Sequence, residues 1–345
     1  MWKTTNKRSS PTMPHRRLRL ARSALAVTAL LAVAVMLVTA CGDRIGANGR
    51  IAVVYLNAEG YYAGVKEGLQ SSLRELPDSP QVVETNAQSD PSQESTFIDT
   101  VSSAGVNALI LSPTSAEASI PAVRLAHDSG IPVICYNTCL TDEATAEFVD
   151  AWVLGSPREF GAISGRQMGE YFQARGVTDP KVGIINCEQF EVCIERRVGF
   201  EEALRALVPG AEIVANQQAL MVDEAVERGG QMITANPDLD AFYGEAGSQT
   251  VGAVRAVEAR KLAGKIAVFG GDMSTQVAEM LRDGSVLKGV ADISGIKVGE
   301  LTAQATLDVL AGNRPDELII PAPVDAYLGP QDGERWLAAH PDGIP

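Results

Sequence analysis

The sequence is poor in histidine, in aromatic residues and in positive charge. Only three histidines occur in 345 residues, and aromatic residues make up 5% of the chain. His15 lies in a basic N-terminal stretch, His127 in a helical pattern and His340 near the C-terminus. A metal site or an acid–base centre built on histidine is therefore not expected, and we predict no metal and no cofactor.

Positive charge is scarce beyond the N-terminus. Seven of the 29 lysines and arginines lie within the first 22 residues, which contain no acidic residue, so the remainder carries 22 basic against 43 acidic residues. Such a surface repels nucleic acid and anionic lipid. We therefore expect no nucleic-acid partner.

The N-terminus has the pattern of an export signal. A basic stretch precedes an apolar run over residues 24–38, and small residues lead to Cys41. This order is typical of a secretory signal peptide, and a cysteine at the cut site resembles the bacterial lipobox, in which that thiol is acylated. We predict a signal peptide over 1–40, a lipidated Cys41 and a tether over 41–49, with the protein at the outer face of the cytoplasmic membrane or in the periplasm. A membrane-spanning anchor is the alternative, although the run is short for one, and Arg16-Arg17 leaves Sec and twin-arginine export both open.

Four further cysteines suit an exported chain with disulfides. Three pairings are possible, and we favour the local ones, Cys135–Cys139 and Cys187–Cys193, over free buried thiols. A zinc site is disfavoured because neither pair has the CxxC spacing and no histidine is near either in sequence.

Short apolar runs alternate with amphipathic stretches along the rest of the chain. Strands are predicted at 50–55, 81–84, 106–112, 131–136, 181–186, 211–215, 240–244 and 265–269. Helices are predicted at 62–76, 92–104, 116–129, 159–175, 195–207, 223–235, 248–260 and 274–282. Continuous apolar strands that alternate with helices indicate parallel sheets. Two successive series predict an α/β protein of two similar doubly wound lobes, with ligands bound beyond the carboxyl ends of the strands.

Several segments together resemble the periplasmic sugar-binding proteins of ABC transporters, of the ribose and galactose type. They are IAVVYL at 51–56 with YYAGVKEG at 61–68, AGVNALILSP at 104–113, AHDSGIPVI at 126–134, ERRVGF at 195–200 and VFGGDM at 268–273. The resemblance covers roughly residues 50–330. It implies the type I periplasmic-binding-protein fold, in which the chain crosses three times between lobes that close about a hinge.

The resemblance also sets the expected domain limits. We place the crossings near 153–156, 291–293 and 321–324. The N-terminal lobe is then 50–153 plus 293–320, and the C-terminal lobe is 154–292 plus 321–345. A monomer and a protein without enzymatic activity are implied.

The resemblance further implies a ligand site at the strand ends. Tyr61 and Tyr62 match two aromatic residues that stack on the faces of a sugar, and Glu59 matches a polar contact. Arg196, with Arg197 as the alternative, would donate to hydroxyl or ring oxygens. The carboxylates of Asp272 and Asp292 are further implied contacts. The predicted ligand-binding set is completed by Asn137, Thr138, Leu220 and Glu245.

Three positions depart from the family pattern. Asn137 and Thr138 stand where the family has an Asp-Arg pair, Ala246 beside Glu245 stands in place of an asparagine, and Leu220 or Met221 replaces an aromatic residue. Fewer side chains than in the family would form hydrogen bonds with ligand hydroxyls. A smaller polyol, a modified sugar or a sugar-like signal therefore fits as well as an aldose. The several carboxylates also permit an amine, whereas the family's calcium loop is not visible.

The function implied is that of a substrate-binding lipoprotein, which captures a monosaccharide or polyol for the permease of an ABC transporter. One alternative is a sensory protein that presents its ligand to a chemoreceptor or sensor kinase, and another is a binder of a nucleoside or an amine. A glycosidase with Asp272 and Asp292 as its carboxylate pair is disfavoured, because an arginine between the acids and two closing lobes suit reversible capture better.

Overall fold

The computed structural model describes residues 49–57 and 60–345. The predicted signal peptide, the lipidated Cys41 and the ligand contact Glu59 lie outside the described residues. Within the described part, no helix combines the length and the apolar character that a membrane span requires.

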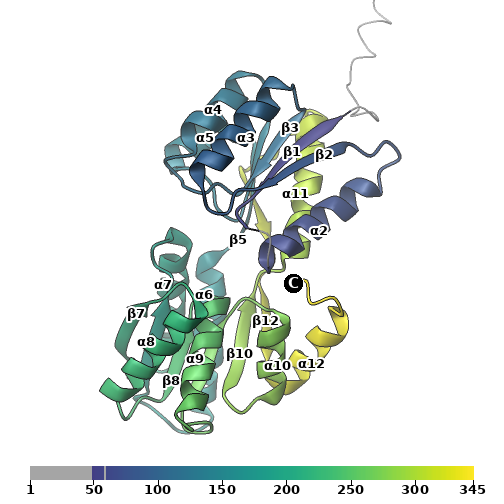
Figure 1. Ribbon diagram of the computed structural model, residues 1–345. Coiled ribbons are helices and arrows are strands. Elements are labelled where there is room, and N and C mark those ends of the chain that lie inside the picture. Colours follow the sequence, from purple (N-terminus) through teal and green to yellow (C-terminus); the bar gives the residue numbers. More distant parts are fainter. Residues whose placement is uncertain (1–48, 58–59) are drawn as a thin grey trace, which may run out of the picture. The chain divides into compact units, whose positions relative to one another are not determined.

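The first sheet holds six parallel strands in the order β11-β5-β4-β3-β1-β2 (Figure 1). Their bounds are β1 Arg50–Tyr55, β2 Gln81–Asn86, β3 Ala108–Leu111, β4 Val133–Tyr136, β5 Ala151–Gly155 and β11 Ile319–Ala322. The central strands β3 and β4 are buried at every residue. This explains why they are apolar throughout instead of alternating.

Two groups of helices cover the two faces of this sheet. Helices α2 (Tyr61–Arg74) and α11 (Gly295–Leu310) pack against one core, and α3 (Pro91–Ser103), α4 (Ile120–Asp128) and α5 (Asp142–Phe148) surround the other. The two helices of the first group touch through glycines. A Cβ on Gly295 would lie 2.2 Å from the carbonyl oxygen of Tyr61, so this contact needs glycine and fixes the start of α2.

The second sheet has the order β7-β6-β8-β9-β10-β12. Its strands are β6 Lys181–Asn186, β7 Glu212–Gln218, β8 Ala241–Gly244, β9 Ala267–Gly271, β10 Leu287–Asp292 and β12 Asp325–Leu328. Helices α6 (Pro157–Gln173) and α7 (Glu191–Leu207) cover one face. Helices α8 (Val222–Ala235), α9 (Gly247–Ala259), α10 (Thr275–Asp283) and α12 (Gly329–Ala339) cover the other.

Both sheets repeat one strand order, and the chain passes between them three times. The passages follow β5, β10 and β11. The prediction of two doubly wound α/β lobes is confirmed, with one difference: the edge strand β12 runs antiparallel to β10. In each lobe the loops at the carboxyl ends of the central strands hold polar side chains, as doubly wound sheets favour.

Candidate functional site

Two tyrosines begin α2 and form the aromatic part of the first lobe's site. Their rings meet edge to face, with centroids 5.3 Å apart. The Tyr62 hydroxyl lies 3.5 Å from Ser112 Oγ and accepts a 3.0 Å hydrogen bond from Asn137 Nδ2. Tyr61 is only partly buried. The pair thus joins an apolar ring surface to a fixed set of neutral polar groups.

The loop after β4 carries Asn137 and Thr138. Asn137 adopts a left-handed backbone conformation with φ 59°, which asparagine tolerates better than most residues. Its carbonyl oxygen accepts from Trp152 Nε1 at 3.3 Å. Thr138 Oγ1 lies 2.8 Å from Ser112 Oγ. Where the family pattern has charge, the first lobe therefore presents neutral donors and acceptors.

Arg196 lies on α7 in the second lobe, and three groups fix its guanidinium. The guanidinium lies over the Phe160 ring at 3.8 Å, Nη1 donates to the carbonyl oxygen of Glu245 at 2.9 Å, and Nη1 lies 3.5 Å from Asp272 Oδ1. The side chain is 11% exposed. The alternative donor, Arg197, instead pairs with Glu188 and Glu201.

Two carboxylates end neighbouring strands of the second sheet. Asp272 directly follows β9 with φ 60°, and its Oδ2 accepts from the backbone N–H of Gly247 at the start of α9. Asp292 ends β10 and is buried, with Oδ1 accepting from Met273 N at 2.8 Å. Burial raises the pKa of Asp292 to about 7, the Met273 hydrogen bond opposes this, and the charge of Asp272 adds to it. The two acids therefore differ in burial and in hydrogen-bond partners.

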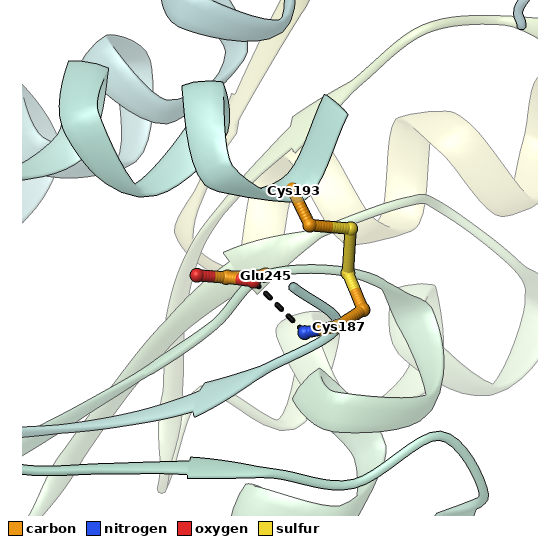
Figure 2. Close-up of side chains that lie close together, drawn as sticks. All are labelled: Cys187, Cys193 and Glu245. Carbon is orange, nitrogen blue, oxygen red and sulfur yellow. Dashed lines mark hydrogen bonds between the residues drawn. A yellow bond between two sulfur atoms is a disulfide. The ribbon is translucent and has the colours of Figure 1, made fainter. Parts of the chain in front are cut away.

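Glu245 follows β8 and lies beside the second disulfide (Figure 2). Its Oε2 accepts from Cys187 N at 2.9 Å. Oε1 is buried and has no hydrogen-bond partner among the described residues. Burial raises the pKa of Glu245 to about 8, opposed by the hydrogen bond from Cys187. Glu245 therefore binds the backbone of the disulfide-closed loop through one carboxyl oxygen.

The structure contains both local disulfides that we favoured, Cys135–Cys139 and Cys187–Cys193. Potential ligand atoms of Cys187, Cys193 and Glu245 lie within 4.8 Å of one another. Metals bind the thiolate form of cysteine, and the two sulfurs here are bonded to each other. In this oxidised state the cluster supplies no thiolate ligands.

Charges of the second lobe act on the tyrosines of the first. Burial raises the pKa of Tyr61 well above its usual range, Asp272 and Asp292 raise it further, and Arg196 lowers it. Asp272 also raises the pKa of Tyr62, and Arg196 also lowers it. These couplings relate residues more than 130 positions apart in the sequence.

The other predicted residue is less closely tied to this set. Leu220 lies between β7 and α8, where its backbone N–H donates to Glu224 Oε2. Three residues that sequence reasoning missed touch the predicted ones: Ser112, Trp152 and Phe160. Ser112 follows a buried strand directly, a signal that could have been used. Phe160 and Trp152 gave no such signal, because packing alone brings them to the site.

Two surface depressions lie elsewhere in the second lobe. One of about 600 Å³ is lined by α8 and α9, and one of about 440 Å³ by α6 and α7. Of the predicted ligand-binding residues that the structure describes, none lines either depression.

The arrangement of strands, crossings and polar loops has known counterparts. The family described as periplasmic binding protein domain matches residues 50–314. The chain belongs to this family. Its members are solute-binding proteins without enzymatic activity, and the prediction of a non-enzyme is confirmed.

Curated relatives agree over most of the chain. The ABC transporter periplasmic-binding protein YphF of Escherichia coli is 47% identical over 86% of this chain and 90% of its own. The D-ribose/D-allose-binding protein of Pseudomonas aeruginosa is 28% identical over 81% of this chain and 89% of its own. The expected membership in the sugar-binding proteins of ABC transporters is thereby confirmed.

Solved structures share the fold at low identity. An ABC transporter solute-binding protein of Actinobacillus succinogenes with bound D-allose has a TM-score of 0.75 at 20% identity, covering 84% of this chain and 100% of that one. A solute-binding protein of Bacillus halodurans with bound myo-inositol has a TM-score of 0.73 at 19% identity, covering 86% and 99%.

Proposed function

We propose that this protein captures a neutral monosaccharide or polyol between its two lobes and delivers it to the permease of an ABC transporter. One observation carries the proposal. Phe160 of the second lobe packs into the same hydrophobic cluster as Tyr61 and Tyr62 of the first, and the Arg196 guanidinium lies 3.8 Å over the Phe160 ring. The face of a sugar ring stacks on an aromatic side chain, and charged groups at the edge of the sugar form hydrogen bonds with its hydroxyls.

The charge states of the site favour a neutral ligand. Arg196 and Asp272 pair with each other, while burial raises the pKa values of Asp292 and Glu245 to about 7 and about 8. A carboxyl group held near neutrality can both donate to and accept from hydroxyls. The relatives whose names mention ribose and allose, and the fold neighbours with allose and inositol, support a polyhydroxylated ligand.

A panel of ligands tests this proposal by thermal unfolding. D-ribose, D-allose, other pentoses and hexoses, myo-inositol, nucleosides and amines would each be added to the purified protein. A ligand at 100 times its Kd adds about 2.7 kcal/mol of stability. We expect a shift with one sugar or polyol. A shift with an amine or a nucleoside alone would overturn the ligand class.

We also propose that Cys41 is acylated and anchors a monomeric protein to the membrane. The support is the sequence order of basic, apolar and small residues before that cysteine. Expressed in bacteria, the native chain should partition with membranes and carry acyl mass at its N-terminus, whereas Cys41→Ala should lose both. Acyl mass absent from the native chain would contradict the anchor.

A further inference from the structure

Each of the two disulfides lies next to ligand-site residues of its own lobe: Cys135–Cys139 encloses Asn137 and Thr138, and Cys187–Cys193 ends three residues before Arg196. We propose that both act as covalent clamps that hold these residues in the binding geometry, so that ligand affinity depends on their oxidation. This inference rests on the proposed function. It assigns the four cysteines a positioning role at the site, beyond their effect on stability.

In the first lobe the clamp encloses the site residues themselves. Asn137 and Thr138 lie inside the ring closed by Cys135 and Cys139. Asn137 is held with φ 59°, its N–H donating to Val153 O at 3.0 Å. That conformation aims Nδ2 at the Tyr62 hydroxyl. A five-residue ring leaves the backbone few other conformations, so Asn137 and Thr138 are ordered before the ligand arrives.

In the second lobe the clamp completes a closed circuit of contacts. Cys187 follows β6, and its disulfide joins it to Cys193 in the first turn of α7 (Figure 2). Three residues later on α7, Arg196 donates to the carbonyl oxygen of Glu245. The Glu245 carboxylate in turn accepts from the N–H of Cys187. The disulfide, the first turn of α7 and the two hydrogen bonds thus form one closed ring of contacts that includes Arg196.

The burial of the cysteines suits clamps better than reversible switches. All four are at most 6% exposed, and exchange requires a thiolate to reach a sulfur atom. Binding to an ordered loop costs less conformational entropy than binding to a loop that must first be ordered. The benefit of each clamp should therefore appear in the affinity as well as in the stability.

The test compares paired cysteine variants with variants of equal or greater destabilisation away from the site. Cys135→Ala/Cys139→Ala removes the first clamp and Cys187→Ala/Cys193→Ala the second. The matched controls are Ile98→Ala on α3 and Leu281→Ala on α10, both fully buried. The ligand is D-ribose, D-allose or myo-inositol, whichever stabilises the native protein, and its Kd is measured calorimetrically well below the unfolding transition.

Each clamp variant should bind about tenfold more weakly, while the controls keep the native Kd despite lower unfolding temperatures. If the native protein binds a ligand and the clamp variants bind it with the same Kd, the proposed role of the disulfides is wrong and the proposed function stands. An equal loss in clamp and control variants would also overturn them, since it would reflect stability. No binding by the native protein to any of the three ligands would overturn the proposed function, and the clamps with it.

A second measurement needs no variant and covers the case of misfolding. A soluble dithiol reduces each bond by exchange, yielding two protein thiols and a cyclic disulfide of the reductant. If reduction of one disulfide weakens binding tenfold, saturating ligand must by reciprocity lower the midpoint potential of that disulfide by about 30 mV. An unchanged potential in saturating ligand would contradict the clamps. Circular dichroism must show that the reduced protein stays folded, because unfolding on reduction would by itself link the potential to the ligand.

Discussion

The Arg196 guanidinium lies over the ring of Phe160, 3.8 Å from its centre. The two residues come from α7 and α6, and Phe160 is fully buried. The aromatic face supports the arginine while its Nη1 reaches Glu245 and Asp272. A cation over a ring gains about 0.5–2 kcal/mol, more when desolvated, so Phe160 holds Arg196 ready for a ligand.

Phe160→Leu should weaken ligand binding several-fold, because the guanidinium loses its support and must be ordered on binding. Phe172→Leu is the matched control, since Phe172 is buried on the same helix in the core beneath α7. Both should lower stability, and only the first should raise the Kd measured by calorimetry. Equal affinities in the two variants would show that the ring does not position Arg196.

Gly161→Ala should disturb the same pair from the other side. A Cβ on Gly161 would lie 1.7 Å from the carbonyl oxygen of Arg196, so α7 must move away from α6. Overpacking of this kind costs about 1–3 kcal/mol. The control is Gly230→Ala on α8, where the nearest atom is the flexible Arg260 guanidinium at 3.3 Å. Urea unfolding should show a loss for the first and little change for the second; the reverse order would contradict the close packing of α6 on α7.

Substitutions of Asn137 separate its backbone from its amide. Asn137→Gly keeps the left-handed conformation but loses the bond to Tyr62, whereas Asn137→Ala loses both. Because a residue with a Cβ pays about 1–2 kcal/mol in this region, the alanine variant should be the less stable of the two. Both should bind ligand more weakly than the native protein. An alanine variant as stable as the glycine one would show that φ at this position is free to relax.

The buried Glu245 should make stability fall as the pH rises. Its pKa is about 8 in the folded protein, above the usual value for a glutamate. Below about pH 4 the group is protonated in both the folded and the unfolded state, so it does not change the free energy of unfolding. Between about pH 4 and 8 only the unfolded state ionises, so the free energy of unfolding decreases, and it levels off above pH 8. Asp292 also lowers the free energy of unfolding as the pH rises, and its contribution levels off near pH 7.

Glu245→Gln should remove part of this decrease, on the order of 1–3 kcal/mol between pH 5 and 9. The amide keeps an acceptor for Cys187 N and carries no charge. Urea unfolding of both proteins at the two pH values measures the difference. Identical pH profiles would show that Glu245 titrates alike in the folded and unfolded states.

The sequence was informative wherever a local pattern decides the structure. Strands such as β3 and β4 are apolar at every position, and the short spacing of each cysteine pair pointed to its partner. The acids after β9 and at the end of β10 were predicted from the family resemblance, and both lie at strand ends, where parallel sheets bind ligands.

Other features depend on packing that no local pattern records. Helix α5 and strand β5, and all elements after α10, were not predicted as elements. Strand β12 pairs antiparallel because it returns to the edge of its sheet directly from β11 in the other one. Phe160 reads as an ordinary core residue, and only the approach of α6 to α7 places it under Arg196.

The central claim is that one ligand is held by residues of both lobes. Its most direct test is to measure the Kd of the sugar or polyol selected by the thermal panel for Tyr61→Ala in the first lobe and Asp272→Ala in the second. Both should bind more weakly than the native protein, with a loss of about 1–3 kcal/mol for the charged hydrogen bonds of Asp272. Native affinity in either variant would contradict a site shared between the lobes.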